Sequence, residues 1–305
     1  MELYDLIIVG GGPAGYTAAL YGARAGLRVL VLEKLSVGGQ MALTHEIDNY
    51  PGYNEGVDGF ELGQRMLQGA KRFGAEAKLS QVLSVDLKAD PKLVRTDSGD
   101  YYAKAVVIST GAEPRKLGLP HEEALIGQGI HYCAACDGMF YRGKTVVLVG
   151  GGNSAAAEAL VLSRVAKRVI LVHRRDSLRA EQAVAQAVQR AENVEIRWNA
   201  QVVEVMHDGR VRGVRLRNVI SGEESEIACD GLFVSIGRQP ASELVRGQVE
   251  LDAAGYIVAG EDTKTNLPGV FAAGDVRTKP VRQIVTATAD GAAAAYAAEG
   301  FLAGH

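Results

Sequence analysis

Cysteine is scarce in this sequence of 305 residues, which contains only Cys133, Cys136 and Cys229. A small and odd number argues against the disulfide framework of a secreted protein. Long apolar runs are also missing, since no stretch approaches the ~20 apolar residues of a membrane span. The N-terminus carries Glu2 and Asp5 and breaks into glycines after a short apolar run, unlike a signal peptide. We therefore expect a cytoplasmic protein with no membrane partner.

Basic residues are in no excess, with 33 Lys and Arg against 36 Asp and Glu and a net charge of −3. This balance gives no support for a nucleic-acid partner. Proline is rare, with 8 residues, and no segment is compositionally biased, which excludes collagen-like and disordered chains. Glycine is abundant, with 37 residues. Such an excess is typical of an α/β nucleotide-binding protein, in which backbones approach closely.

A pattern of apolar strand, glycine-rich turn and helix occurs twice along the chain. The first copy begins with an apolar run at 4–9, and the second begins with a run at 145–150. Continuous apolar runs of this length are typical of parallel strands buried on both faces. Each copy has about the length of a dinucleotide-binding half. A further strand at 269–275 and a helix at 282–302 complete the chain.

This internal repeat predicts an α/β fold with two Rossmann-like dinucleotide-binding domains. The C-terminal segment has no repeat of its own, so its strand needs a sheet to join. The simplest account inserts the second domain into the first. The first domain is then 1–113 with 244–305, and the second is 114–243. Within the second domain we expect a helix over 178–191. We also expect a hairpin formed by one strand over 194–206 and another over 211–217.

The first glycine-rich turn has the spacing Gly10-x-Gly12-x-x-Gly15 between a strand and a helix. In dinucleotide-binding folds the first glycine makes the turn, the second admits a pyrophosphate and the third allows close helix packing. Glu33 follows 23 residues after Gly10, at the end of the next strand, where a carboxylate accepts hydrogen bonds from ribose hydroxyls. The alternative is a tight turn that binds nothing.

The second turn has the spacing Gly150-x-Gly152-x-x-Ala155. The same count of 23 residues from Gly150 leads to His173, which Arg174 and Arg175 follow. A 2′-phosphate is repelled by a carboxylate and held by guanidinium groups, so this turn predicts NADP(H). Arg179 lies four residues further on and can join the group. The alternative is a solvated run of charge at the end of a strand.

Cys133 and Cys136 form a C-x-x-C with Asp137 directly after it. Two thiols at this spacing can close a reducible disulfide ring, and the neighbouring carboxyl group can move protons for a thiolate. A structural zinc site needs four ligands, and no second pair of Cys or His residues supplies them. Two buried structural cysteines are the other alternative. Cys229 lies in an expected strand and is interpreted as a small buried apolar residue.

Gly274-Asp275 follows the apolar run of the C-terminal strand. A carboxylate at that strand end could bind a ribityl hydroxyl in an enzyme with two dinucleotides. On spacing alone it could equally cap a helix.

Taken together, these motifs resemble the low-molecular-weight thioredoxin reductases of the bacterial type over essentially the whole chain. The resemblance is carried by GGGPAGYTAA (10–19), GGQ (38–40), DNYPG (48–52), STGAEPR (109–115), CAACDGMFYRGK (133–144), GGGNSAAAEA (150–159), HRRDSLRA (173–180), GVFAAGDV (269–276) and RQIVTATADG (282–291). It implies FAD in the first domain, NADPH and the redox disulfide in the second, and a homodimer.

The family's residues can be carried over onto matching positions. Its FAD contacts correspond to Gly10, Gly12, Pro13, Ala14, Gly15, Glu33, Gly39, Gln40, Asn49, Thr110, Gly111, Asp275, Arg282, Gln283 and Ile284. Its NADPH contacts correspond to Gly152, Asn153, Ser154, His173, Arg174, Arg175, Arg179, Ile236 and Gly237. Its catalytic residues correspond to Cys133, Cys136 and Asp137.

An apolar pair that meets thioredoxin in the family corresponds to Met139 and Phe140. The family often has two aromatic residues there. Met139 departs from this pattern, which is a sign that the partner protein could differ from that of the family. The family rotates its NADPH domain about two linkers, which correspond to segments near 113–118 and 241–246. Electrons would pass from NADPH to FAD, then to the disulfide, with Cys136 on the flavin side, and finally to thioredoxin or a thioredoxin-like protein.

Three other functions remain open at this point. A reductase of the same fold could feed another carrier, such as a glutaredoxin-like or a peroxidase-reducing protein. A flavin-dependent dithiol oxidase would have no need of the residues His173 to Arg175. A dinucleotide sensor without catalysis would have no need of the C-x-x-C.

Overall fold

The computed structural model describes residues 2–44 and 46–304. The chain divides into two compact units, Met1–Glu113 with Gln239–His305 (unit 1) and Pro114–Arg238 (unit 2). Unit 2 thus ends at Arg238, five residues before the expected boundary at 243. The reason is hydrogen bonding: the Ala241 N–H donates to the Gly111 carbonyl at 3.0 Å and its carbonyl accepts from Thr110 Oγ1 at 2.6 Å, which holds Ala241 in unit 1.

Unit 1 contains one mixed sheet of seven strands in the order β3-β2-β1-β6-β5-β4, with β17 also paired to β6. The strands β3, β2, β1, β6 and β17 run parallel, and β4, β5 and β6 form an antiparallel meander. The C-terminal strand therefore joins the first sheet, as the inserted arrangement requires. The strands are β1 (Leu3–Val9), β2 (Val29–Glu33), β3 (Glu76–Leu79), β4 (Val82–Asp86), β5 (Lys92–Thr96), β6 (Gly99–Ile108) and β17 (Val270–Ala272).

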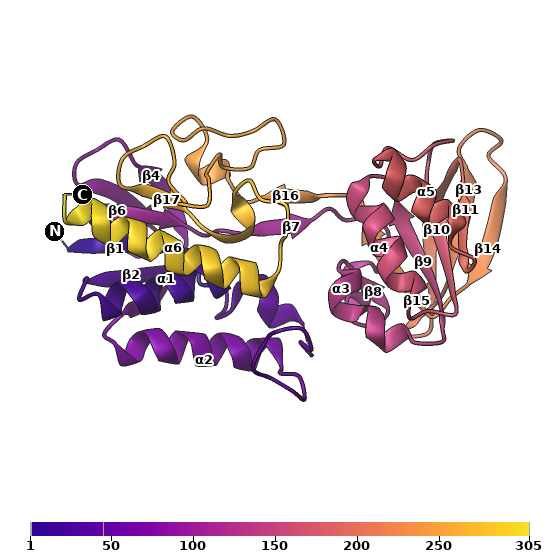
Figure 1. Cartoon of the computed structure of the whole chain (residues 1–305), viewed down its shortest axis with the longest axis horizontal. Helices are drawn as coiled ribbons and strands as arrows, with labels where there is room; N and C mark the ends of the chain where they lie inside the picture. The colour runs from indigo at the N-terminus through magenta and orange to yellow at the C-terminus, as the bar shows by residue number, and fades with distance from the viewer. Residues whose placement is uncertain (1, 45, 305) are drawn as a thin grey trace. The chain divides into compact units, whose positions relative to one another are not determined.

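Three helices belong to unit 1: α1 (Pro13–Arg24), α2 (Gly59–Arg72) and α6 (Ile284–Leu302). Asp58 caps α2 by accepting from the Glu61 N–H, and Gln283 and Thr286 form a capping box at the start of α6. The alanine-rich α6 lies close against α1 (Figure 1), because a Cβ at Gly291 would stand only 2.2 Å from the Ala14 carbonyl oxygen. This contact fixes α6 over the first glycine-rich turn.

Unit 2 repeats the parallel arrangement in the order β11-β10-β9-β15-β8 and adds an antiparallel sheet, β12-β13-β14. In unit 1, β17 pairs with β6 at the C-terminal end of the chain. In unit 2, β8 takes the corresponding place beside β15, although β8 precedes the unit's first long strand in the sequence. Its strands are β8 (Ile130–His131), β9 (Thr145–Gly150), β10 (Arg168–Val172), β11 (Val194–Arg197), β12 (Ala200–His207), β13 (Val211–Asn218), β14 (Glu224–Ala228) and β15 (Gly231–Ser235). Its helices are α3 (Ala134–Asp137), α4 (Asn153–Ser163) and α5 (Gln182–Arg190).

Two expected elements of unit 2 differ from the structure. The strand expected over 194–206 is two strands, β11 in the parallel sheet and β12 in the antiparallel one. The chain turns between them at Asn199, which adopts a positive φ of 50°. The helix expected over 178–191 begins only at Gln182. The expected hairpin is present, since β12 and β13 pair antiparallel.

The chain passes between the units twice, through β7 (Ala112–Pro114) and β16 (Arg238–Pro240), which pair with each other. Short 3-10 helices complete the described structure: η1 (Gly39–Leu43), η2 (Glu123–Leu125), η3 (Gly138–Tyr141), η4 (Glu243–Val245) and η5 (Gly274–Val276). Within residues 2–44 and 46–304, no helix has both the length and the apolar character needed to cross a bilayer.

Candidate functional site

The first glycine-rich turn leads from β1 into α1 and tolerates no side chains at two positions. Gly10 has a φ of +109°, and a Cβ there would lie 2.4 Å from the Ser109 carbonyl oxygen. A Cβ at Gly15 would lie 1.9 Å from the Gly10 carbonyl oxygen. The close packing of α1 against this turn leaves its N-terminal N–H groups available, which is the geometry that binds a pyrophosphate.

Gly12 presents the open side of this turn, since a Cβ there would meet only the Gly38 carbonyl oxygen, 3.9 Å away. Glu33, at the end of β2, accepts hydrogen bonds from the Gly11 N–H at 2.7 Å and the Leu35 N–H at 3.0 Å. These bonds fix the carboxylate beside the turn, and each oxygen can still accept a further hydrogen bond. The arrangement fits the adenosine end of a dinucleotide with free ribose hydroxyls.

The other residues predicted to bind FAD come from segments far apart in the sequence. A Cβ at Gly39 would lie 3.3 Å from the Gly12 Cα, so η1 lies against the first turn. A Cβ at Gly274 of η5 would likewise lie 3.0 Å from the Ala14 Cβ, so η5 lies against the start of α1. Asn49 donates to Gln283 at 3.1 Å. The remaining residues lie where their elements begin or end: Pro13 in α1, Gln40 in η1, Thr110 and Gly111 after β6, Asp275 in η5, Arg282 before α6 and Ile284 at its start.

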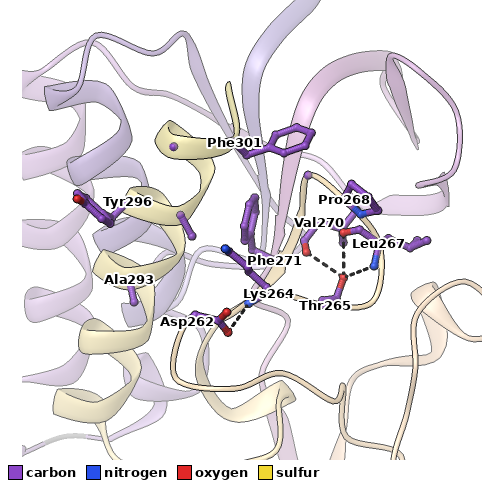
Figure 2. A pocket seen from close by; sticks show the side chains of 13 residues that line it. Asp262, Lys264, Thr265, Leu267, Pro268, Val270, Phe271, Ala293, Tyr296 and Phe301 are labelled. Atoms are coloured by element: carbon purple, nitrogen blue, oxygen red, sulfur yellow. Dashed lines mark hydrogen bonds between the residues drawn. The ribbon is translucent and has the colours of Figure 1, made fainter. Parts of the chain in front are cut away.

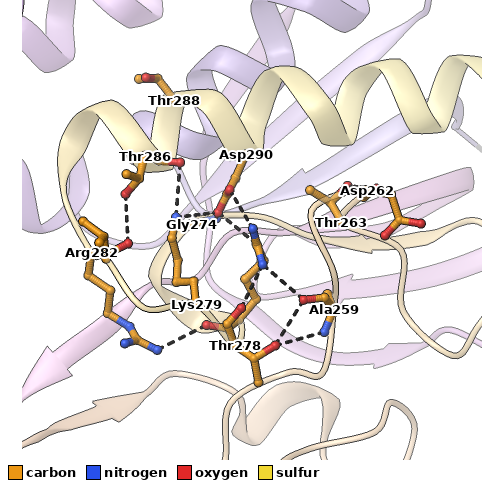
Figure 3. Close-up of polar contacts among 12 residues, drawn as sticks. Ala259, Asp262, Thr263, Gly274, Thr278, Lys279, Arg282, Thr286, Thr288 and Asp290 are labelled. Carbon is orange, nitrogen blue, oxygen red and sulfur yellow. Dashed lines mark hydrogen bonds and ion pairs between the residues drawn. The ribbon is translucent and has the colours of Figure 1, made fainter.

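Asp290 holds the η5 segment in place, a contact that the sequence analysis missed. Its side chain points from α6 toward Gly274 (Figure 3) and accepts from the Gly274 N–H at 2.9 Å. Arg277 donates to both carboxylate oxygens, and Lys279 donates at 2.7 Å. These cations hold the pKa of Asp290 below its usual value although burial opposes that shift. No local spacing signals this cluster, because its members meet only through the packing of α6.

The second glycine-rich turn, between β9 and α4, has the same construction. A Cβ at Gly150 would lie 2.4 Å from the Ser235 carbonyl oxygen, whereas Gly152 has open space around it. A Cβ at Gly151 would lie 2.1 Å from the His173 ring, so His173 takes the place that Glu33 has beside Gly11. Burial lowers the pKa of His173, and its Nε2 has no hydrogen-bond partner among the described residues.

The three arginines predicted to bind NADPH are exposed near this turn. The backbone N–H of Arg179 donates to the Gly151 carbonyl at 2.7 Å, which places that segment against the turn. Arg174, Arg175 and Arg179 form no ion pair within residues 2–44 and 46–304. Guanidinium groups that form no ion pair among the described residues, beside a pyrophosphate-binding turn, fit a 2′-phosphate.

The last four predicted NADPH residues lie on two elements of the same unit. Asn153 and Ser154 begin α4, and the side-chain Oδ1 of Asn153 accepts from the Glu181 N–H at 2.7 Å. Ile236 and Gly237 follow β15, whose end pairs with Gly150. The carboxyl ends of adjacent parallel strands therefore bring these residues to the second turn.

Cys133 and Cys136 form a disulfide at the start of the short helix α3. Cys133 is the N-cap residue, and its Sγ accepts from the Cys136 N–H at 3.2 Å. Asp137 ends α3 and is half-buried, and Met139 and Phe140 follow with 49% and 41% of their surfaces exposed. A redox disulfide thus lies beside an apolar surface on the same unit as the second glycine-rich turn.

Cys229, the third cysteine, is buried and unpaired. Burial raises the pKa of its thiol to about 12, so it stays protonated at neutral pH. This confirms the interpretation of Cys229 as a small apolar residue.

Glu158 is a buried carboxyl group that the sequence analysis did not single out. It lies in α4, and burial raises its pKa to about 7, while Arg238 acts in the opposite direction. Its Oε2 has no hydrogen-bond partner among the described residues. The folded state binds the proton of the Glu158 carboxyl group more tightly than the unfolded chain does. The contribution of this proton to the stability of the fold is therefore fully present below pH 4.5 and is lost as the pH rises through 7.

Replacing Glu158 with glutamine should therefore stabilise the protein at pH 8 and change little at pH 4.5. The shift from 4.5 to about 7 corresponds to a gain on the order of 3 kcal/mol at pH 8. Urea unfolding at the two pH values measures the difference. Glu192→Gln, at an exposed glutamate of the same unit, is the control. An equal effect of Glu158→Gln at both pH values would contradict the prediction.

A separate cavity of about 460 Å³ lies in unit 1 beside the end of α6. Phe271, Tyr296 and Phe301 border it together with the loop at 262–270 (Figure 2). None of the residues predicted to bind a cofactor or to react lines this cavity. It is therefore not part of the candidate site.

Comparison with known proteins agrees with this construction. The family model described as pyridine nucleotide-disulphide oxidoreductase matches residues 4–291. The chain therefore belongs to the pyridine nucleotide-disulphide oxidoreductase family, whose fold combines FAD- and NADPH-binding domains of the Rossmann type. Its cofactors are FAD and NADPH, and both glycine-rich turns have the open side and close packing that these groups need.

Within this family the chain is similar to bacterial-type thioredoxin reductases. It is 46% identical over 302 residues to the thioredoxin reductase of Mycolicibacterium smegmatis, covering 99% of this chain and 97% of the relative. It is also 46% identical to that of Streptomyces coelicolor, covering 99% and 95%. The crystal structure of thioredoxin reductase from Streptococcus pyogenes MGAS5005 matches with a TM-score of 0.92 at 40% identity, covering 99% of both chains.

Proposed function

We propose that this chain is an NADPH-dependent thioredoxin reductase, passing electrons from NADPH through FAD and the Cys133–Cys136 disulfide to thioredoxin. The observation that carries this proposal is that unit 2 combines a disulfide with a glycine-rich turn and three arginines that have no ion-pair partner in the described part of the chain. When bound, FAD accepts a hydride from NADPH and delivers two electrons to the disulfide.

The residue assignments are part of the proposal. Glu33 and the first turn hold the adenosine and pyrophosphate of FAD, while η5, fixed by Asp290, presents Asp275 to the cofactor. His173, Arg174 and Arg175 hold the adenosine phosphate of NADPH. Asp137 protonates a thiolate formed when the disulfide opens. The geometry at both turns supports these roles.

Both the disulfide and the NADPH turn belong to unit 2, whereas the FAD turn belongs to unit 1. Hydride transfer and attack on a disulfide each need direct contact. We therefore propose that unit 2 rotates during each cycle about β7 and β16, which connect the units near the expected linker at 113–118. The other expected linker, at 241–246, lies within unit 1. Which cysteine attacks the partner is left open.

The partner enters through the exposed pair Met139 and Phe140, whose apolar surface fits a thioredoxin or a thioredoxin-like protein. A glutaredoxin-like or peroxidase-reducing protein is the second candidate, which the unusual Met139 favours. We further propose a cytoplasmic homodimer without nucleic-acid or membrane partners. The slight negative charge supports the absence of a nucleic-acid partner, and the scarcity of cysteine supports a cytoplasmic location. The homodimer rests on the resemblance to the family, and sedimentation or size-exclusion measurements test it.

Anaerobic titration of the purified yellow protein with NADPH tests the function. We expect rapid loss of the visible flavin absorbance and uptake of about two NADPH per chain, since the flavin and the disulfide each take two electrons. NADH should act more slowly. Uptake of a single equivalent would mean that the disulfide takes no part, and no loss of absorbance with either nucleotide would overturn the proposal. Addition of thioredoxin or glutaredoxin to the reduced protein then distinguishes the carriers.

A further inference from the structure

His131 connects the proposed acid Asp137 to a buried tyrosine. Its Nδ1 lies 3.3 Å from Asp137 Oδ2, and its Nε2 lies 2.7 Å from the Tyr141 hydroxyl. The side chains of His131 and Asp137 are only 10% and 17% exposed. The sequence analysis gave His131 no role, because nothing in its spacing points to Asp137.

Neighbouring aromatic rings fix the orientation of the His131 imidazole. His131 ends β8, whose parallel register with β15 places it beside Phe233. The two rings stack at 5.2 Å, and the Tyr141 ring meets the imidazole edge-on at 5.2 Å. A Cβ at Gly231 would lie 2.3 Å from the Tyr141 ring, so this glycine is what makes room for the tyrosine. The contacts on both sides of the imidazole therefore depend on one strand pairing.

The two partners of His131 differ in what they can do. Burial is the main cause that raises the pKa of Tyr141 to about 12, so its hydroxyl keeps its proton at neutral pH. A hydroxyl both donates and accepts, whereas a carboxylate only accepts. Further charges lie on the tyrosine side: Arg210, Asp230 and Lys144, the last 5.4 Å from the Tyr141 ring centre. Asp137 is the charged group that contacts the imidazole itself.

We propose that His131 is a positioning residue that holds the carboxyl group of Asp137 and shares one proton with it during reduction of the disulfide. This proposal rests on the proposed function. While the Asp137–His131 pair holds the proton, Nε2–H donates to the Tyr141 oxygen. Once the proton has left, Nδ1–H donates to the Asp137 carboxylate and the Tyr141 hydroxyl turns to donate to Nε2. His131 therefore keeps its hydrogen bonds to Asp137 and Tyr141 both before and after the proton leaves.

Two electrons, which come from NADPH through FAD, break the Sγ–Sγ bond and leave two thiolates. One thiolate takes the proton that Asp137 delivers, which gives one thiol and one thiolate. The Asp137–His131 pair then takes a proton from water and returns to its first state. The Asp137–His131 pair can thus regain its proton without leaving a buried polar group without a hydrogen-bond partner.

One variant tests this role, because His131→Gln can still donate to Asp137 but cannot exchange a proton. In stopped-flow experiments with NADPH, reduction of the flavin should be unchanged in this variant. Electron transfer from flavin to disulfide should slow about tenfold in His131→Gln and lose one ionisation from its pH profile. His121→Gln, which removes an exposed histidine of the same unit, should leave the profile unchanged.

The outcomes separate this inference from the function itself. If the wild-type protein takes up only one NADPH, the proposed function fails. If it takes up two and His131→Gln matches it in rate and pH profile, only the role of His131 fails. In an Asp137→Asn background the His131→Gln change should have no further effect, and a persisting effect would overturn the proposal. If the variants do not fold, NMR titration of His131 in the wild-type holoenzyme decides, since an identical titration before and after disulfide reduction also overturns it.

Discussion

Replacement of Cys136 with serine is expected to abolish electron transfer to thioredoxin while leaving reduction of the flavin by NADPH intact. A serine hydroxyl cannot form the disulfide that receives two electrons, so the chain loses the proposed path from flavin to partner. We expect thioredoxin reduction to fall by at least about a thousandfold, as for loss of a nucleophile in other enzymes. The measurements are NADPH consumption with thioredoxin as acceptor and stopped-flow bleaching of the flavin.

Cys229→Ala provides the matched control for this experiment. Cys229 is buried, unpaired and held protonated, so its loss should leave both rates as they are. The anaerobic titration should fall from about two NADPH per chain to about one in Cys136→Ser and stay at two in Cys229→Ala. If Cys136→Ser still carried electrons to thioredoxin, the disulfide would not be the carrier and the proposed mechanism would be wrong.

The sequence predicted those parts of the site that depend on short, rigid segments. A strand, a glycine-rich turn and a helix have few ways to pack, so Gly10 and Gly150 could be placed from spacing alone. The count of 23 residues held because it leads in both copies to the end of the next strand, where Glu33 lies against Gly11 and His173 lies against Gly151. These features depend on the geometry of short segments, and the spacing of residues in the sequence reflects that geometry directly.

Features that depend on long-range packing were not predicted. His131 faces Asp137 only because β8 pairs with β15, and a strand of two residues carries no periodicity that would reveal it. Asp290 gains its cations only when α6 folds back over η5. The break between β11 and β12 also escaped, since an apolar pattern continues across it and only the backbone of Asn199 marks the turn. In each case the sequence signal is weaker than the tertiary contact that overrides it.

The double substitution Arg174→Ala and Arg175→Ala should remove the preference for NADPH. Both guanidinium groups are exposed beside the second turn, and charge-assisted hydrogen bonds to a phosphate contribute about 1.5–3 kcal/mol each. We expect kcat/KM for NADPH to fall by about a hundredfold and that for NADH to change by less than about twofold, since 1.4 kcal/mol corresponds to a factor of ten. Steady-state kinetics with each nucleotide and thioredoxin as acceptor measure the two values.

General attraction between an anionic nucleotide and the protein must be separated from recognition of the 2′-phosphate. Arg164→Ala with Arg190→Ala removes two exposed arginines from the same unit, and both double variants take the net charge from −3 to −5 (−3 − 2). If the control pair weakens NADPH as much as the first pair does, the effect is one of overall charge. Equal losses with NADPH and NADH in the first pair would show that these arginines do not read the 2′-phosphate. Because Glu33 stands beside the first turn where His173 stands beside the second, a selective loss would also explain how one fold, used twice in one chain, keeps its two dinucleotides apart.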